Sequence, residues 1–189
     1  MSNDASPFPF KGWKGNQYEG GIKTPMIMTW KNKIKSNTQF DGFISALDIF
    51  KTSLEASSVN KEYMINADGK NIMNFLNDNN IKNENLFWRK DKMATVRSGN
   101  YKLIRLNDTS TVLYNIKKNY FEDFDLKINE SQVHDSLLKL LSSWENTLID
   151  PNWIENKNWN IVTEMIYEDL MTNRDIRALS PKDLNNSVK

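Results

Sequence analysis

The chain has 189 residues, of which 39% are hydrophobic and 26% charged, and its formal net charge is +1. This balance gives no overall field to attract nucleic acid or an anionic membrane, and no apolar run reaches the roughly 20 residues of a membrane span. The sequence has no cysteine and one histidine, which excludes disulfides, thiolate nucleophiles and multi-histidine metal sites within these residues.

The first 23 residues are predicted to form a shaped loop. Residues 11–21, KGWKGNQYEGG, hold four of the chain's seven glycines. Lys14 in this loop is able to hold an anion through its ammonium and the nearby backbone N–H groups, although composition alone favours a solvated lysine. Asn3 and Asp4 offer oxygen ligands for a hard cation, although such a pair near a terminus is more often a turn or cap. Residues 1–10 lack the basic start and apolar stretch of a signal peptide, so the protein is expected to be intracellular or to begin upstream of Met1.

The next segments predict the edge of an α/β layer. Residues 24–30, TPMIMTW, are a continuous run of bulky side chains, which is typical of a strand buried on both faces. Residues 43–56 carry apolar side chains at the spacing of one helix face and predict a helix. A shorter helix is predicted over residues 70–78, after the turn signal of Asp68 and Gly69.

From residue 85 the period of the hydrophobic side chains changes from about 3.6 to 2, which predicts strands. Connections of a few polar residues join these strands, so they are expected to pair antiparallel as a meander. The predicted strands cover residues 86–89, 93–99, 101–106 and 111–116.

Two amphipathic helices are predicted toward the C-terminus. Residues 130–148 present one apolar stripe that is expected to lie across the small sheet, with His134 at its boundary. Residues 159–171 form a second amphipathic stretch, and the polar end SPKDLNNSVK after it is expected to fray. Four aromatic side chains are expected in the core where the sheet meets the helix: Phe87, Trp88, Trp144 and Trp153.

Several sequence blocks occur in one series between about residues 2 and 154. In chain order they are KGWKGNQYEGGIKTPMIMTW, SALDIFKTSL, DGKNIM, LFWRKDKMATVRSGNYKLIR, VLYNIKKNYFEDFDL and a helix that ends in tryptophan before Pro-Asn-Trp. This series resembles the C-terminal part of the formylglycine-dependent sulfatases, of the arylsulfatase type within the alkaline phosphatase-like superfamily. The resemblance implies an α/β fold: the edge of a large α/β sheet, followed by a small antiparallel sheet packed by a C-terminal helix.

The chain is expected to divide into three regions, of which the resemblance covers the first two. Residues 1–80 are expected to be the incomplete C-terminal edge of the catalytic α/β domain. Residues 81–154 are expected to form the small subdomain of antiparallel sheet and helix. Residues 155–189 are expected to be a tail with one candidate helix.

Members of this family carry a lysine at the place of Lys14, where it contacts the sulfate ester. The resemblance therefore implies a catalytic and substrate-binding role for Lys14, because a fixed ammonium stabilises the charge that develops on a sulfuryl group. Glu19, Gly20 and Gly21 are interpreted as structural residues that shape the turn presenting the lysine.

The departures from the family pattern lie ahead of this loop. The family nucleophile is a formylglycine made from a Cys/Ser-x-Pro-x-Arg motif, which this sequence does not contain. The formylglycine and most metal ligands are therefore expected on N-terminal sequence absent here. MSNDAS stands where the late metal motif of the family occurs, so Asp4 and, after it, Asn3 are the candidate ligands of a Ca²⁺ ion.

These implications leave several functions open. The chain is expected to be part of a sulfatase acting on a sulfated small molecule or sulfated carbohydrate, inactive by itself and completed by the N-terminal portion. The alternatives are a non-catalytic split product that acts as a binding or folding partner, and part of a phosphate or phosphonate ester hydrolase of the same superfamily. Members of the family are commonly periplasmic, secreted or lysosomal, which the resemblance implies without a signal peptide in this sequence.

Overall fold

The computed structural model describes residues 9–57, 62, 67–77 and 85–185. These residues belong to two compact units, and each is described by itself below. The first unit combines residues Met1–Thr24 with Phe87–Lys189, and the second spans Pro25–Leu86. The boundary predicted between residues 80 and 81 falls outside the described residues.

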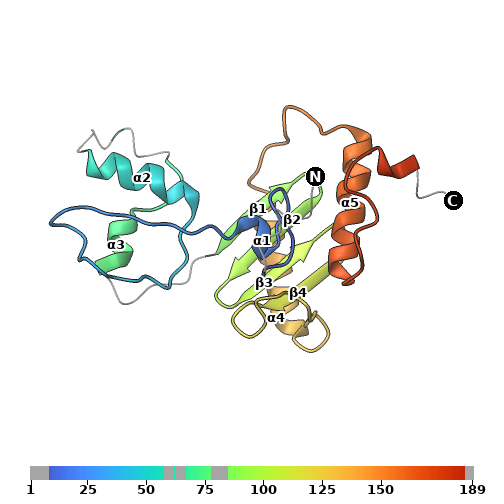
Figure 1. Ribbon diagram of the computed structural model, residues 1–189, viewed down its shortest axis with the longest axis horizontal. Coiled ribbons are helices and arrows are strands. Elements are labelled where there is room, and N and C mark those ends of the chain that lie inside the picture. Colours follow the sequence, from blue (N-terminus) through green and yellow to red (C-terminus); the bar gives the residue numbers. More distant parts are fainter. Residues whose placement is uncertain (1–8, 58–61, 63–66, 78–84, 186–189) are drawn as a thin grey trace. The chain divides into compact units, whose positions relative to one another are not determined.

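A four-stranded antiparallel sheet forms the centre of the first unit (Figure 1). Strands that are adjacent in the sheet are also consecutive in the sequence, which confirms the predicted meander. In the register, Leu103 of the third strand lies opposite Val96 on one side and Leu113 on the other. The strands are β1 (Leu86–Lys90), β2 (Met93–Ser98), β3 (Tyr101–Arg105) and β4 (Thr111–Asn115).

Helix α4 (Ser131–Glu145) covers one face of this sheet, as its apolar stripe predicts. The Phe87 ring stacks on the Trp144 ring with centroids 4.9 Å apart. Trp153, in contrast, is 82% exposed, so its predicted place in the core is wrong. Trp153 lies after the end of α4, in a segment that does not pack on the sheet. The buried side chains of this face are Ala94, Val96, Leu103, Leu113, Leu137 and Leu141.

Helix α5 (Lys157–Met171) and the N-terminal loop supply buried side chains to the other face of the sheet. Strand residues alternate between the two faces, so the sheet has an apolar core on each side. The expected fraying after α5 does not begin at residue 180, because the Asp183 carboxylate accepts hydrogen bonds from the backbone N–H groups of Leu179 and Ser180. The buried core on this face comprises Tyr18, Met93, Ile104, Leu106, Val112, Tyr114, Ile116, Tyr167 and Leu170.

The second unit contains the two predicted helices, α2 (Ala46–Ala56) and α3 (Ile72–Asn77). A capping box formed by Ser45 and Asp48 begins α2. The other carboxylate oxygen of Asp48 accepts the backbone N–H of Lys70 at 2.8 Å, which ties α2 to the segment before α3. None of the described helices in either unit is long and apolar enough to cross a membrane.

The buried strand expected over residues 24–30 does not form in the second unit. These residues have no strand conformation, and Ile27 is 92% exposed. The apolar face of α2 is open as well, since Leu47 and Phe50 are 57% and 59% exposed. A strand requires a neighbouring strand for its backbone hydrogen bonds, and the described residues between 25 and 85 form none.

Limited proteolysis is expected to cut the 189-residue chain first between residues 25 and 57. Most residues of this stretch are exposed and none forms a strand, whereas the loop before it is hydrogen-bonded to strand β2 and to helix α5. Mass spectrometry of the early fragments identifies the cut sites. First cuts within strands β2 to β4, or equal protection of all segments, would contradict this expectation.

Candidate functional site

The glycine-rich segment of residues 11–21, the Lys14 loop, is anchored on the sheet by three consecutive side chains. The Gln17 side chain accepts a hydrogen bond from the Thr95 hydroxyl at 2.7 Å. Tyr18 is fully buried, and Glu19 is 1% exposed at the start of the short helix α1 (Glu19–Ile22). The loop is therefore held on the sheet by residues that stand three to five positions after Lys14 in the sequence.

Two glycines of this loop are required by its geometry. Gly12 has φ +77°, in the left-handed region that side chains disfavour. A Cβ at Gly21 would lie 2.1 Å from the backbone oxygen of Asn16 and 2.6 Å from that of Trp13. The loop folds back on itself at this point, which explains why glycine is concentrated here.

A buried cluster of charged side chains lies beneath the Lys14 loop. The Lys102 ammonium, 0% exposed, is 3.0 Å from the Glu19 carboxylate and 2.8 Å from the Glu122 carboxylate. Arg97 lies 3.6 Å from the other oxygen of Glu19. The Glu122 carboxylate also accepts the backbone N–H of Glu19 at 2.8 Å. Two glutamates and two cations thus join the loop to strands β2 and β3 and to the segment after β4.

Burial shifts the pKa of two members of this cluster, Glu122 and Arg97. Desolvation raises the pKa of Glu122 above its ordinary value of 4.5, and the nearby Lys102 ammonium opposes that rise. Desolvation likewise lowers the pKa of Arg97. Glu122 has φ 58°, which is unfavourable for a side-chain-bearing residue. Its ion pair and hydrogen bonds hold the residue in this conformation.

Lys14 itself is exposed at the tip of the loop, together with Gly15. Trp13 before it packs against the buried core of this face. The ammonium of Lys14 is thus presented to solvent by a backbone that is fixed on both sides. Such an arrangement suits contact with an external anion, and the role of Lys14 stays a prediction.

The candidate metal ligands Asp4 and Asn3 lie outside the described residues. Within the described part of the chain, no three histidine or acidic side chains come together in a way that would hold a metal ion. Both ring nitrogens of His134 form hydrogen bonds within the protein. Nε2 lies 2.9 Å from the Thr111 hydroxyl, and Nδ1 lies 3.0 Å from the Asp135 carboxylate. It is a boundary residue, as the sequence indicates.

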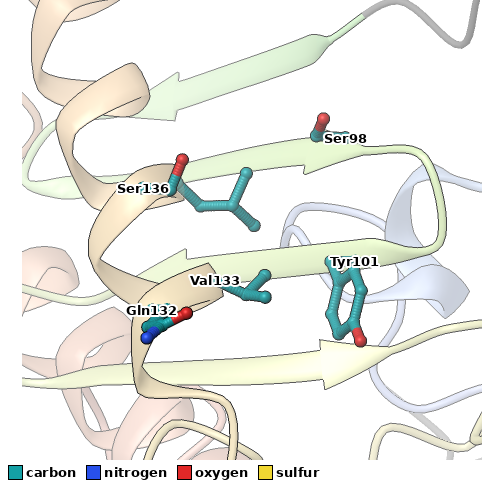
Figure 2. A pocket seen from close by; sticks show the side chains of 6 residues that line it. Ser98, Tyr101, Gln132, Val133 and Ser136 are labelled. Atoms are coloured by element: carbon teal, nitrogen blue, oxygen red, sulfur yellow. The ribbon is translucent and has the colours of Figure 1, made fainter.

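A shallow cavity of about 300 Å³ lies on the α4 face of the sheet (Figure 2). Figure 2 shows Ser98 and Tyr101, from neighbouring strands, beside residues of α4. The Lys14 loop packs on the opposite face, so this cavity takes no part in the candidate site. Its lining residues are Ser98, Tyr101, Gln132, Val133, Ser136 and Leu137.

Sequence reasoning missed the residues that support the loop. Lys102 lies on the same face of its strand as Ile104 and Leu106, which are both apolar and buried. A lysine at such a position in the sequence could have indicated a buried cation. Glu122 and Tyr167 had no comparable local signal. Both contact the loop across more than 100 residues of sequence.

The sheet, helix α4 across it and the Lys14 loop from residue 12 onward fall within the part of the chain that one family model matches. A family model described as N-sulphoglucosamine sulphohydrolase, C-terminal, matches residues 12–146, and the chain belongs to this family. The predicted resemblance and the mixed α/β fold class are therefore confirmed.

Two curated sulfatases are similar to part of the chain. An uncharacterized sulfatase, YdeN, of Escherichia coli K12 is 35% identical over 80 residues, which are 41% of this chain and 14% of that protein. Human steryl-sulfatase is 31% identical over 80 residues, which are 41% of this chain and 13% of that protein. The aligned region thus spans less than one sixth of either relative.

A solved structure, Ps i-CgsB, has the same fold. Its TM-score is 0.70 at 24% identity, with 82% of this chain and 36% of that chain covered. The same protein has been solved in complex with a k-i-k-neocarrahexaose, where the TM-score is 0.69 at 24% identity and 87% of this chain and 39% of that chain are covered. The chain therefore corresponds in fold to about a third of that structure.

Proposed function

We propose that this chain is the part of a sulfatase that contacts the sulfate group of a sulfate monoester, carried on a sulfated small molecule or sulfated carbohydrate. The observation that carries the proposal is the Lys14 loop, which presents one exposed lysine from an anchored backbone inside the family-matched residues. The Lys14 ammonium would stabilise the negative charge that spreads over the sulfuryl oxygens and the leaving group. Fixed charges of this kind need little reorganisation during the reaction.

The nucleophile and most metal ligands belong, in this proposal, to sequence N-terminal to residue 1. The nucleophile would be a formylglycine. Asp4 and Asn3 would contribute one carboxylate and one amide oxygen to a Ca²⁺ site. Oxygen ligands suit this cation, but two residues supply fewer ligands than it requires. Such an ion, when bound, would neutralise part of the sulfate charge.

The sequence upstream of Met1 tests this proposal directly. An in-frame Cys/Ser-x-Pro-x-Arg motif in the upstream DNA would supply the nucleophile that the proposal requires. If neither this motif nor any other nucleophile lies upstream, catalysis is excluded and a non-catalytic split product that acts as a binding or folding partner is favoured. An upstream serine, threonine or aspartate nucleophile without that motif would favour a phosphate or phosphonate ester hydrolase instead.

The isolated 189-residue chain is expected to show no turnover of an aryl sulfate such as 4-nitrophenyl sulfate. Lys14 would stabilise a transition state, yet no residue of this sequence carries the formylglycine motif that would attack the sulfur. Absorbance of the released phenol measures the rate against a buffer blank. Turnover that Lys14→Ala abolishes would show that the chain contains its own nucleophile, contrary to the expectation.

A further inference from the structure

Helix α5 lies beyond the residues that the family model matches, yet it contacts the Lys14 loop on both sides of Lys14. After Lys14, the backbone N–H of Gln17 donates a hydrogen bond to the Tyr167 hydroxyl at 2.8 Å. Tyr167 is fully buried, and its ring centroid is 5.9 Å from that of Tyr18. Burial raises the pKa of Tyr167, so the acceptor is a neutral hydroxyl at any physiological pH.

Before Lys14, the side chain of Lys11 reaches the C-terminal end of α5. Its ammonium donates to the Leu170 carbonyl at 3.1 Å and to the Glu122 carbonyl at 2.6 Å, and it also contacts the Asn173 side chain. The last carbonyls of a helix lack partners within the helix, and the helix dipole favours a cation there. Lys11 therefore ties the beginning of the loop to α5.

We infer that α5 positions the Lys14 loop, with Tyr167 as its positioning residue, so that the Lys14 ammonium meets a sulfate ester at a fixed place. The loop is fixed at Lys11 and at Gln17, which leaves only the short segment between them to adjust. Fixing a charged group before the substrate arrives reduces the free-energy cost of ordering it later. The assignment of a sulfate ester as the ligand of Lys14 rests on the proposed function, whereas the attachment of the loop to α5 does not.

Tyr167→Phe in the 189-residue chain tests the attachment. The substitution removes the hydroxyl and leaves the ring, so the buried Gln17 N–H loses its acceptor. Hydrogen–deuterium exchange at the Gln17 amide is expected to become about tenfold faster, while the amides of β3 and β4 exchange as in the wild type. The matched control is Tyr101→Phe, which removes a hydroxyl 3.4 Å from Glu130 on the opposite face and should leave Gln17 unchanged.

Unchanged exchange at Gln17 in Tyr167→Phe, or equal acceleration in β3 and β4, would overturn the attachment. The role in positioning is tested in the enzyme completed by its upstream sequence, where kcat/KM for an aryl sulfate should fall about 3- to 10-fold in Tyr167→Phe. A loosened loop with undiminished kcat/KM, in an enzyme that depends on Lys14, would overturn the positioning role alone. Turnover that does not depend on Lys14 would overturn the proposed function, whatever the amide exchange shows.

Discussion

Replacing Lys102 with methionine is expected to lower the free energy of unfolding by about 3 to 5 kcal/mol. Methionine keeps most of the side-chain volume but removes the ammonium that lies 2.8 Å from Glu122 and 3.0 Å from Glu19. Arg97 remains near Glu19, so the main cost is a Glu122 carboxylate that stays buried without this ion pair. Urea unfolding of the 189-residue chain, followed by circular dichroism, measures the change.

Lys127→Met is the matched control for this substitution. The Lys127 side chain is 43% exposed and forms an ion pair with Asp125 at 3.3 Å. Exposed pairs of this kind contribute about 0 to 1 kcal/mol, because water and salt screen them. Equal losses of stability in the two variants would refute the energetic importance of the buried cluster.

The loss of stability in Lys102→Met should also depend on pH. Glu122 has a pKa raised above 4.5 in the folded protein, and removing the Lys102 ammonium removes an influence that lowers it. A carboxyl group that binds its proton more tightly when folded favours folding at low pH, and this contribution is lost as the pH rises through the folded pKa. The difference between wild type and variant should therefore shrink as the pH is lowered toward 5. A constant difference between pH 8 and pH 5 would assign the loss to packing.

Lys14→Ala is expected to lower kcat/KM of the complete enzyme for an aryl sulfate by about 10²- to 10³-fold. The expected loss is that of one preorganised charge aimed at the developing negative charge of the transition state. Because Lys14 is exposed, the same substitution should change the free energy of unfolding by less than about 0.5 kcal/mol. Steady-state kinetics and urea unfolding of the same preparations separate the two effects.

Lys92→Ala serves as the charge control for Lys14→Ala. The Lys92 side chain, in the turn between β1 and β2, is 73% exposed and pairs with Glu164 at 3.6 Å, outside the Lys14 loop. It removes the same net charge, so a comparable loss of kcat/KM would mean that overall charge, not the position of Lys14, governs the rate. A loss confined to Lys14→Ala supports the assigned role.

Much of the first unit was predictable from local patterns. The period-2 alternation after residue 85 placed all four strands, and the stripe on residues 130–148 placed α4 on the sheet. These predictions succeed because strand and helix periodicity depend on near neighbours in the sequence. The strand predicted over residues 24–30 failed for the opposite reason, since an apolar run becomes a strand only when another strand pairs with it.

By itself, the sequence determined that residues 11–21 form a shaped loop with a lysine, and that the chain resembles a sulfatase C-terminal part. It did not determine what holds that loop. Only the tertiary structure brought Lys102, Glu122 and Tyr167 beneath it. Periodicity tells which side chains share a face, whereas the distant segment that covers this face is decided by packing and by the need to pair buried charges.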